Sequence, residues 1–151
     1  MNTDTDMVKN HIEEVIEIKV PSSTRHLHAM RLLTKNLAES MGFGNRDSEK
    51  AALAVEEALT NVIEHAYHGQ EDNKMHVIFE IDNNKLTVRI LHKGDQIDIS
   101  RVFAADDLSH FYLQKKKGGL GILLMKRCMD EVTYKTGPHQ NECCMIKYLK
   151  K

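Results

Sequence analysis

The hydrophobic positions of the chain repeat with two different periods, and the changes of period mark the expected elements. Between residues 12 and 20, β-branched residues alternate with charges, which is typical of an edge or half-buried strand. Apolar positions then recur at helical spacing. This pattern predicts a helix that is capped by Ser22 or Ser23 and ends at Gly42 and Gly44.

A second helix is predicted from a cap at Asn45 or Asp47 to about Tyr67, with an apolar stripe wide enough for burial on more than one side. Two strands, 74–82 and 85–93, follow it and are joined by a tight Asn-Asn turn. The remaining predicted elements are a glycine-entered helix over 119–132 and a closing hairpin of strands 131–136 and 142–150.

The order of these elements predicts one α+β two-layer sandwich spanning residues 1–151. Helices are interspersed with strands that are mostly linked as hairpins, so we expect a mixed, mainly antiparallel sheet with helices on one face. Residues 1–10 are expected to form a loose end. The segment 94–117 has weak periodicity and many charges, and long segments of this kind in compact domains are often functional.

Composition excludes several function classes. The 151 residues include 21 basic and 22 acidic side chains and no tryptophan, which argues against binding to nucleic acid or to an anionic membrane surface. The polar N-terminus does not resemble a signal peptide, and no apolar run reaches the length of a membrane span. The three cysteines lack metal or disulfide spacing, so we expect reduced thiols in a cytoplasmic protein.

The segment "KKKGGLGILLMKRCMDEV" (115–132) has the chemistry of a phosphate cradle. Gly118, Gly119 and Gly121 precede an apolar helical run, and glycines let backbone amides approach an anion at a helix N-terminus. Three lysines stand just upstream. The segment is neither a Walker loop nor a dinucleotide fingerprint. A glycine hinge beside a solvated lysine run explains the same residues equally well.

The second predicted helix carries an unusual polar line. Glu57, Asn61 and His65 are spaced four residues apart, which stacks them on one face of a helix. An amide oxygen suits Mg²⁺, which takes few ligands from the protein, and a carboxylate one turn earlier could act as a general base. These residues could equally be the solvated face of an amphipathic helix, and His65 could simply serve the end of its own helix.

The two segments together resemble a known family. "EEALTNVIEHAYHG" (56–69) is similar to the asparagine box of the Bergerat-fold ATPases, the superfamily of histidine kinase-like ATPases. With "GGLGILLMKRCMDEVTY" (118–134), it resembles more narrowly the bacterial anti-sigma-factor serine kinases. The resemblance extends over residues 12–149 in order and spacing. It implies a nucleotide-binding protein with serine/threonine kinase activity that takes part in partner switching and regulates transcription.

The resemblance also implies roles for individual residues. Glu57 resembles the catalytic base and Asn61 the Mg²⁺ ligand. Residues 94–117 resemble the ATP lid. The implied partners are a sigma factor and a small anti-anti-sigma protein of the STAS class, with homodimer formation also possible. The other residues expected to contact Mg·ATP are His65, His92, Gly94, Asp98, Lys117, Gly118, Gly119, Leu120 and Gly121.

The chain departs from the family pattern in "RILHKGDQIDIS" (89–100). His92 stands where the family has an aspartate that accepts a hydrogen bond from the adenine amino group, and Gln96 replaces a glycine. A neutral histidine can accept through one ring nitrogen, whereas a protonated histidine can only donate. Loss of such a buried acceptor costs about 1–3 kcal/mol. Asp95 could substitute through a register shift, although it lies beyond Gly94.

Three functions therefore remain open. The protein is an active ATP-dependent serine kinase and anti-sigma factor, or a degenerate relative that binds regulatory partners with little or no nucleotide. Alternatively, it is a phosphate-binding or structural module that shares only the fold. Glu57 and Asn61 favour the first function, and His92 and Gln96 favour the second.

Overall fold

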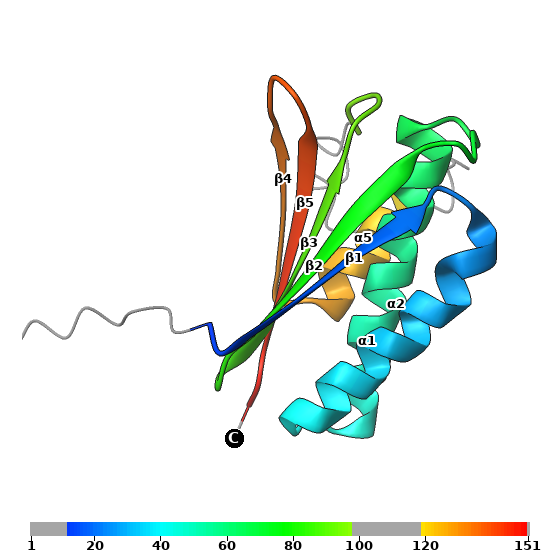
Figure 1. Ribbon diagram of the computed structural model, residues 1–151. Coiled ribbons are helices and arrows are strands. Elements are labelled where there is room, and N and C mark those ends of the chain that lie inside the picture. The colour runs from blue at the N-terminus through cyan, green and yellow to red at the C-terminus, as the bar shows by residue number, and fades with distance from the viewer. Residues whose placement is uncertain (1–11, 98–118, 151) are drawn as a thin grey trace, which may run out of the picture.

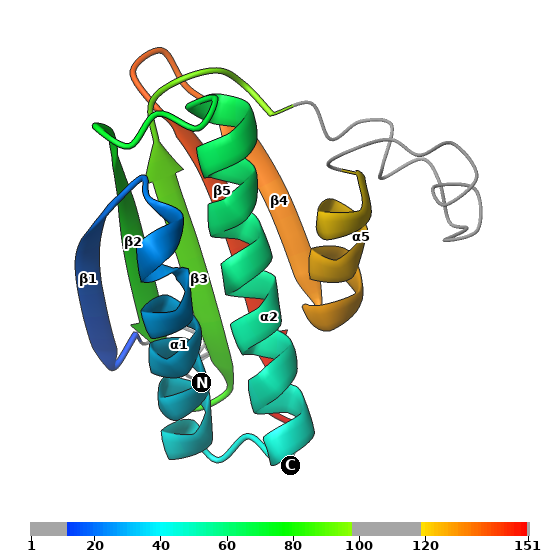
Figure 2. The same ribbon diagram turned by 90° about the vertical axis from the view of Figure 1, so that its right-hand side faces the viewer.

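A five-stranded sheet and three helices form the two layers of the molecule in a computed structural model, which describes residues 12–97 and 119–150. All three helices cover the same face of the sheet (Figures 1 and 2). The predicted α+β sandwich is therefore confirmed. None of the helices in these two ranges is both long and apolar enough to cross a bilayer. The expectations for residues 1–10 and for 98–117 lie outside the described residues.

The first half of the chain follows the predicted order. Strand β1 (Glu14–Pro21) leads through a 3₁₀ turn (Thr24–His26) into α1 (Leu27–Met41). The α2 helix (Asn45–Asn61) continues directly into a π-helical turn, Val62–Ala66.

The second half contains one helix between two hairpins. The elements are β2 (Lys74–Ile81), β3 (Lys85–His92), α5 (Gly119–Cys128), β4 (Glu131–Thr136) and β5 (Asn141–Tyr148). The predicted third helix thus ends four residues earlier than expected, because Glu131 and Val132 pair with β5 as the start of β4.

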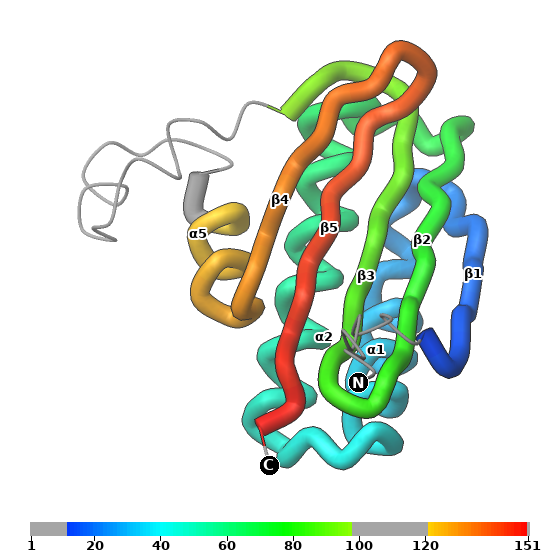
Figure 3. The backbone as a smooth tube through the Cα atoms, turned by 90° about the vertical axis from the view of Figure 1, so that its left-hand side faces the viewer, coloured from blue at the N-terminus to red at the C-terminus, as the bar shows by residue number. Residues whose placement is uncertain are grey.

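The strands are arranged in the order β1-β2-β3-β5-β4, as the view onto the uncovered face shows (Figure 3). All four pairings between described strands are antiparallel, so this part of the sheet is not mixed. Antiparallel sheets can leave one face in water, which fits the charged residues that alternate with apolar ones along β1 and β3.

The core lies between the sheet and α2. This helix packs against both α1 and α5, and it is buried on several sides as its wide apolar stripe predicted. Small residues let the neighbouring elements approach it closely. The α2 side chains with no exposed surface are Ser48, Ala51, Ala52, Ala54, Val55, Ala58 and Leu59, and the largest fully buried side chain of the protein's described part is Phe79 of the sheet.

Local signals at the element ends were partly correct. Ser23 caps the 3₁₀ turn, and Gly42 ends α1 with a left-handed φ of 104°. The prediction that Asn45 or Asp47 caps α2 was wrong, because the N-cap is Gly44, which provides no side chain.

The β2–β3 hairpin forms where predicted, but the residue before the Asn-Asn pair holds the turn. Asp82 Oδ1 accepts hydrogen bonds from the backbone N–H of Asn84 at 2.6 Å and of Lys85 at 2.8 Å. A side-chain carboxylate thus replaces backbone acceptors inside the turn, as aspartates commonly do.

A buried lysine fixes the C-terminal end of α5 to the sheet. Lys147 is only 7% exposed, and its Nζ donates to the Cys128 carbonyl at 2.7 Å and lies 3.8 Å from Asp47 Oδ1. A cation at a helix C-terminus satisfies an orphan carbonyl and complements the helix dipole. The orientation of α5 beside α2 therefore depends partly on β5.

Replacing this lysine tests the anchor. Lys147→Met should lower the free energy of unfolding by about 1–3 kcal/mol, because it leaves a buried carbonyl without its donor. The exposed Lys150 provides the matched variant Lys150→Met, which should change stability by less than about 0.5 kcal/mol. Urea denaturation measures both values. Equal stabilities of the two variants would show that the Lys147 contact contributes nothing.

Candidate nucleotide site between α2 and α5

Glu57 and Asn61 lie one turn apart at the end of α2, on the side that faces α5. Asn61 is only 3% exposed, and its Nδ2 donates to the Sδ of Met125 on α5 at 3.5 Å. A solvated helix face would leave this amide in water, so that interpretation fails for Asn61. Buried polar side chains normally have partners or a function, and here a thioether provides only a weak acceptor.

Gly121 brings the first turn of α5 directly onto these two residues. A β-carbon added at this position would lie 2.7 Å from Glu57 Oε2 and 3.5 Å from Asn61 Oδ1. Figure 2 shows α5 alongside α2 at this level. Gly121 therefore lets the Glu57 carboxylate lie directly against the first turn of α5, since an added side chain would force that carboxylate to move. The glycine-rich segment and the polar helix line, which the sequence separates by sixty residues, form one site.

The carboxylate of Glu57 is partly removed from water. Burial raises its pKa above the ordinary value, and the nearby charges of Glu56 and Glu64 raise it further. A carboxylate whose pKa is shifted toward neutrality is a better proton acceptor at physiological pH. Its position beside the N-terminal turn of α5 gives the site a candidate base.

His65 lies in a π-helical turn, whereas its predicted alignment with Glu57 and Asn61 assumed a regular α-helix. The α-helical hydrogen bonds give way to π-type bonds after Asn61, including Tyr67 N–H to Val62 O at 3.0 Å. Stacking at four-residue steps holds only in a regular α-helix, so it unites Glu57 with Asn61 but does not extend to His65. The imidazole lies near Glu64, with 4.0 Å between Nε2 and Oε2. Single π turns are frequent at functional sites.

Gly94 joins the end of β3 to this π turn. Its φ is +87°, and an added β-carbon would lie 2.6 Å from the Ala66 carbonyl oxygen, so both conformation and space require glycine. The next residue, Asp95, donates its backbone N–H to that carbonyl at 3.1 Å. The loop after β3 therefore begins beside Ala66, the last residue of the π turn that follows Asn61.

His92 is enclosed at the end of β3. It is 2% exposed, its Nδ1 lies 2.9 Å from the Lys93 carbonyl oxygen, and its ring meets the Tyr67 ring edge-on at 6.2 Å between centroids. Burial lowers its pKa below the ordinary value, which favours the neutral ring. The suggestion that Asp95 replaces a missing carboxylate is excluded, because Asp95 Oδ2 instead pairs with His68 Nε2 at 2.6 Å on the surface.

The remaining predicted contacts are placed less fully. Asp98, Lys117 and Gly118 lie outside the described residues. Gly119 and Leu120 open α5 beside Gly121, as expected for the glycine segment, and their side chains are not described.

Two residues that sequence reasoning missed hold the β3 loop in place. The Tyr67 hydroxyl accepts from the Lys93 N–H at 2.8 Å and donates to the Lys74 carbonyl at 3.1 Å. Asn141 Nδ2 donates to the Gly94 carbonyl at 3.3 Å. The sequence motif around Tyr67 was recognised, but its partner Lys93 is distant in the chain. The motif alone therefore did not predict a role for Tyr67.

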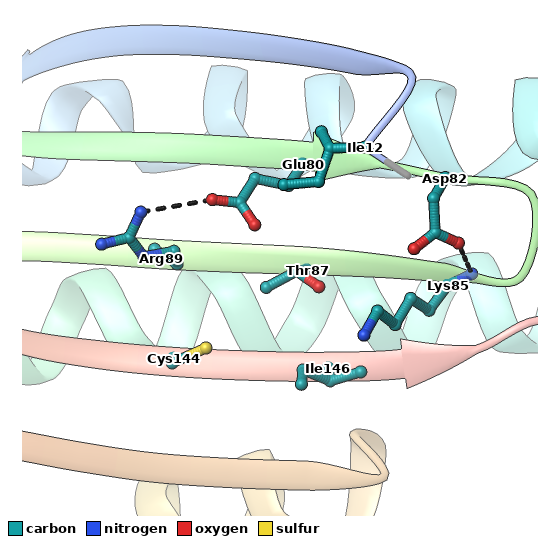
Figure 4. Close-up of a pocket in the computed structure, with 8 residues that line it drawn as sticks. All are labelled: Ile12, Glu80, Asp82, Lys85, Thr87, Arg89, Cys144 and Ile146. Carbon is teal, nitrogen blue, oxygen red and sulfur yellow. Dashed lines mark hydrogen bonds and ion pairs between the residues drawn. The ribbon is translucent and has the colours of Figure 1, made fainter. Parts of the chain in front are cut away.

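A separate cavity of about 330 Å³ lies on the uncovered face of the sheet and contains none of these residues (Figure 4). Arg89 dominates it and pairs with Glu80 at 3.2 Å and with Glu142. Because Arg89 is already paired with two acidic side chains, this cavity is a weaker candidate site than the space beside α5. It is lined by Ile12, Glu80, Asp82, Lys85, Thr87, Arg89, Cys144 and Ile146.

Comparisons with known proteins point to one family. The family model of the histidine kinase-like ATPase domain matches residues 20–147. The serine-protein kinase RsbW of Bacillus velezensis is 33% identical over 141 residues, covering 90% of this chain and 86% of that protein. RsbW of Staphylococcus aureus strain JH9 is 35% identical over 149 residues, covering 92% of this chain and 89% of that protein.

A solved structure has the same fold at low identity. The RsbU and RsbW domains of Rv1364c from Mycobacterium tuberculosis superpose with a TM-score of 0.63 and 11% identity, over 91% of this chain and 33% of that one. Together with the residue-level match to the asparagine box and the glycine segment, these likenesses settle the family. The chain belongs to the histidine kinase-like ATPase domain family, in the group that contains the RsbW serine-protein kinases.

Proposed function

We propose that the chain is a Mg·ATP-dependent serine kinase and anti-sigma factor that phosphorylates a small anti-anti-sigma partner. One observation carries the proposal. The glycine of the α5 N-terminal turn lies against a buried asparagine and a partly buried glutamate of α2. That contact joins an anion-binding helix terminus, a hard oxygen ligand and a base in one place.

The residues present fit the proposed magnesium ion. The space that a side chain at position 121 would fill is bordered by the Asn61 amide oxygen and the Glu57 carboxylate, which are hard oxygen donors. Mg²⁺ typically takes one or two protein ligands and completes its shell with water and substrate phosphates. When bound, it would neutralise phosphate charge. Asn61 would hold it through its amide oxygen, while the amide nitrogen is engaged by Met125 Sδ at 3.5 Å.

Glu57 is the proposed catalytic base. The hydroxyl oxygen of the partner serine attacks the γ-phosphorus of ATP, its proton passes to the Glu57 carboxylate, and the bond to the departing ADP breaks. Catalysis of phosphoryl transfer consists mainly of positioning and charge stabilisation, so the raised pKa of Glu57 is an aid rather than the main effect. The fixed contact with the α5 turn provides the positioning.

The proposed phosphate cradle includes Lys117, Gly118, Gly119, Leu120 and Gly121. Backbone N–H groups of the first turn of α5 are free of helical acceptors, and the helix dipole favours an anion there. Gly94 and Asp98 are proposed to border the nucleotide from the β3 side, with His65 near the π turn. The RsbW relatives are named serine-protein kinases, which supports the choice of serine as the phosphate acceptor.

The proposed partners are a sigma factor and a STAS-class anti-anti-sigma protein, with self-association as a further possibility. The alternative is a relative that keeps the fold and the partners but not the nucleotide. Incubating the chain with Mg·[γ-³²P]ATP and a serine-bearing STAS partner separates the two. Transfer of label to the partner supports the kinase, whereas a stable complex without transfer or ATP binding supports the alternative.

Removing the base should abolish transfer while nucleotide binding remains. Glu57→Gln should lower kcat by about 10²–10⁴-fold, because the amide cannot accept the serine proton. The fold and the affinity for Mg·ATP should change little. The neighbouring Glu56, which pairs with Arg31 at 2.9 Å, provides the matched variant Glu56→Gln, which should keep most of the activity. If both glutamine variants retain full kcat, Glu57 is not the base.

Filling the contact at Gly121 should separate stability from activity. Gly121→Ala places a methyl group where Glu57 Oε2 lies 2.7 Å away, so the flexible carboxylate must move aside. A shift of about 1 Å at a reacting group costs about 10²-fold in rate. Alanine is the better helix former, so the thermal midpoint should stay level or rise.

Gly44→Ala is the control for that substitution, because no atom lies within 4 Å of its added β-carbon. Phosphotransfer rates and thermal unfolding should be measured for both variants. The site assignment requires that only Gly121→Ala loses activity. Full activity of Gly121→Ala would mean that the position of the Glu57 carboxylate is unimportant for transfer.

A further inference from the structure

His92 faces the helix layer at the point where the sheet meets the end of the asparagine-bearing helix. It pairs with Asn141 across β5, in the same alternation as the buried Val88 and Ile90. Tyr67 covers one side of its ring edge-on. Two residues later, Gly94 contacts Ala66, so the imidazole is held against the same helical segment that carries Asn61.

The tautomer of His92 follows from its one hydrogen bond. Nδ1 lies 2.9 Å from the Lys93 carbonyl oxygen, and a carbonyl can only accept, so Nδ1 carries the proton. In a neutral ring, Nε2 is then a lone-pair acceptor. This atom is buried, and it has no hydrogen-bond partner within residues 12–97 and 119–150. An open buried acceptor of this kind is able to accept from a bound molecule or from water.

The surroundings of His92 oppose a positive charge on its ring. Burial is the main cause that lowers its pKa below about 6.5. The group facing it from the helix end is the Tyr67 hydroxyl, which bridges Lys93 and Lys74, and the residue facing it from β5 is the uncharged Asn141. The charged or titratable side chains that share a cavity of about 470 Å³ with His92 and Tyr67 are Lys19, Asp72, Lys74, His76 and Lys93.

We propose that His92 makes nucleotide binding acid-sensitive, because its neutral Nε2 accepts the amino hydrogen bond of adenine and its protonated form cannot. This inference rests on the proposed ATP-binding function and adds a mode of regulation to it. A carboxylate in this position would remain an acceptor throughout the physiological pH range. The imidazole instead becomes a donor at both nitrogens when protonated, and it then opposes the donating amino group.

The Nε2 lone pair also distinguishes adenine from guanine. Adenine presents an amino donor at its sixth ring position, whereas guanine presents a carbonyl acceptor there. With GTP, the carbonyl oxygen of guanine would lie opposite Nε2, and two acceptors cannot form a hydrogen bond with each other. GTP should therefore bind at least about 10-fold more weakly than ATP.

A ligand pair isolates the His92 contribution from every other titration. Purine riboside 5′-triphosphate has the same phosphates as ATP but lacks the amino group. The pH dependence of its affinity therefore reflects every titrating group except one that acts through the amino contact. Calorimetry should measure both ligands with Mg²⁺ between pH 5.5 and pH 8. The affinity ratio of ATP to the analogue reports on Nε2 alone.

In the wild type, this ratio should be about 10–100 at pH 8. Below the His92 pKa it should fall by up to about tenfold for each pH unit, toward one, because binding through the lone pair excludes one proton. In His92→Asp the ratio should stay constant from pH 6 to pH 8. In His92→Leu it should be near one throughout.

Three outcomes overturn the proposal. If the ratio in the wild type does not depend on pH, while both ligands bind, the acid switch is absent but the nucleotide site stands. An equal fall in His92→Asp places the titration at another group. If neither the wild type nor His92→Asp binds ATP at any pH, the proposed function fails as well. Long-range ¹H–¹⁵N spectra of the histidine rings provide a second check, since the proposal requires a proton on Nδ1 and none on Nε2 at pH 8.

Discussion

The approach of α5 to α2 at Gly121 is the constraint on which the candidate site depends. A β-carbon at position 121 would lie 2.7 Å from Glu57 Oε2, so glycine there lets this carboxylate and Asn61 lie against the first turn of α5. Several features of the fold serve this approach. Alanines on α2 bring the sheet and both other helices close, and Lys147 ties the far end of α5 to β5. The site is therefore a consequence of close helix packing. Its chemistry depends on which polar side chains this packing partly removes from solvent.

A second set of contacts fixes the opposite border of the site. The π turn, Tyr67 and Asn141 hold the start of the β3 loop through three backbone groups of Lys93, Gly94 and Asp95. These contacts bury His92 and leave its Nε2 without a partner among the described residues. The two borders differ in kind. The carboxylate and amide oxygens of Glu57 and Asn61 lie beside the first turn of α5, whereas the buried imidazole of His92 lies at the end of β3.

Much of this architecture could be predicted from local sequence, because its signals are local. Alternating and helical periodicities located all five described strands and the three helices, and the Asn-Asn turn closed the β2–β3 hairpin as expected. Two of the failures share a physical reason, since they depend on distant partners. The Ala66 carbonyl of the π turn accepts from Asp95 in the β3 loop, and Lys147 is buried where its Nζ donates to the Cys128 carbonyl at the end of α5. The stacking of Glu57 with Asn61 was predictable, whereas the burial of Asn61 required the position of α5.

The central claim is that a nucleotide binds between α2 and α5, and backbone amide shift mapping tests it most directly. Mg·ATP should be titrated into ¹⁵N-labelled protein while the amide signals of the whole chain are followed. The largest shifts should occur at Asn61, Gly94 and Gly121, while Thr87 and Cys144 beside the cavity on the uncovered face stay unchanged. Shifts confined to that cavity, or no shifts at millimolar Mg·ATP, would contradict nucleotide binding between α2 and α5.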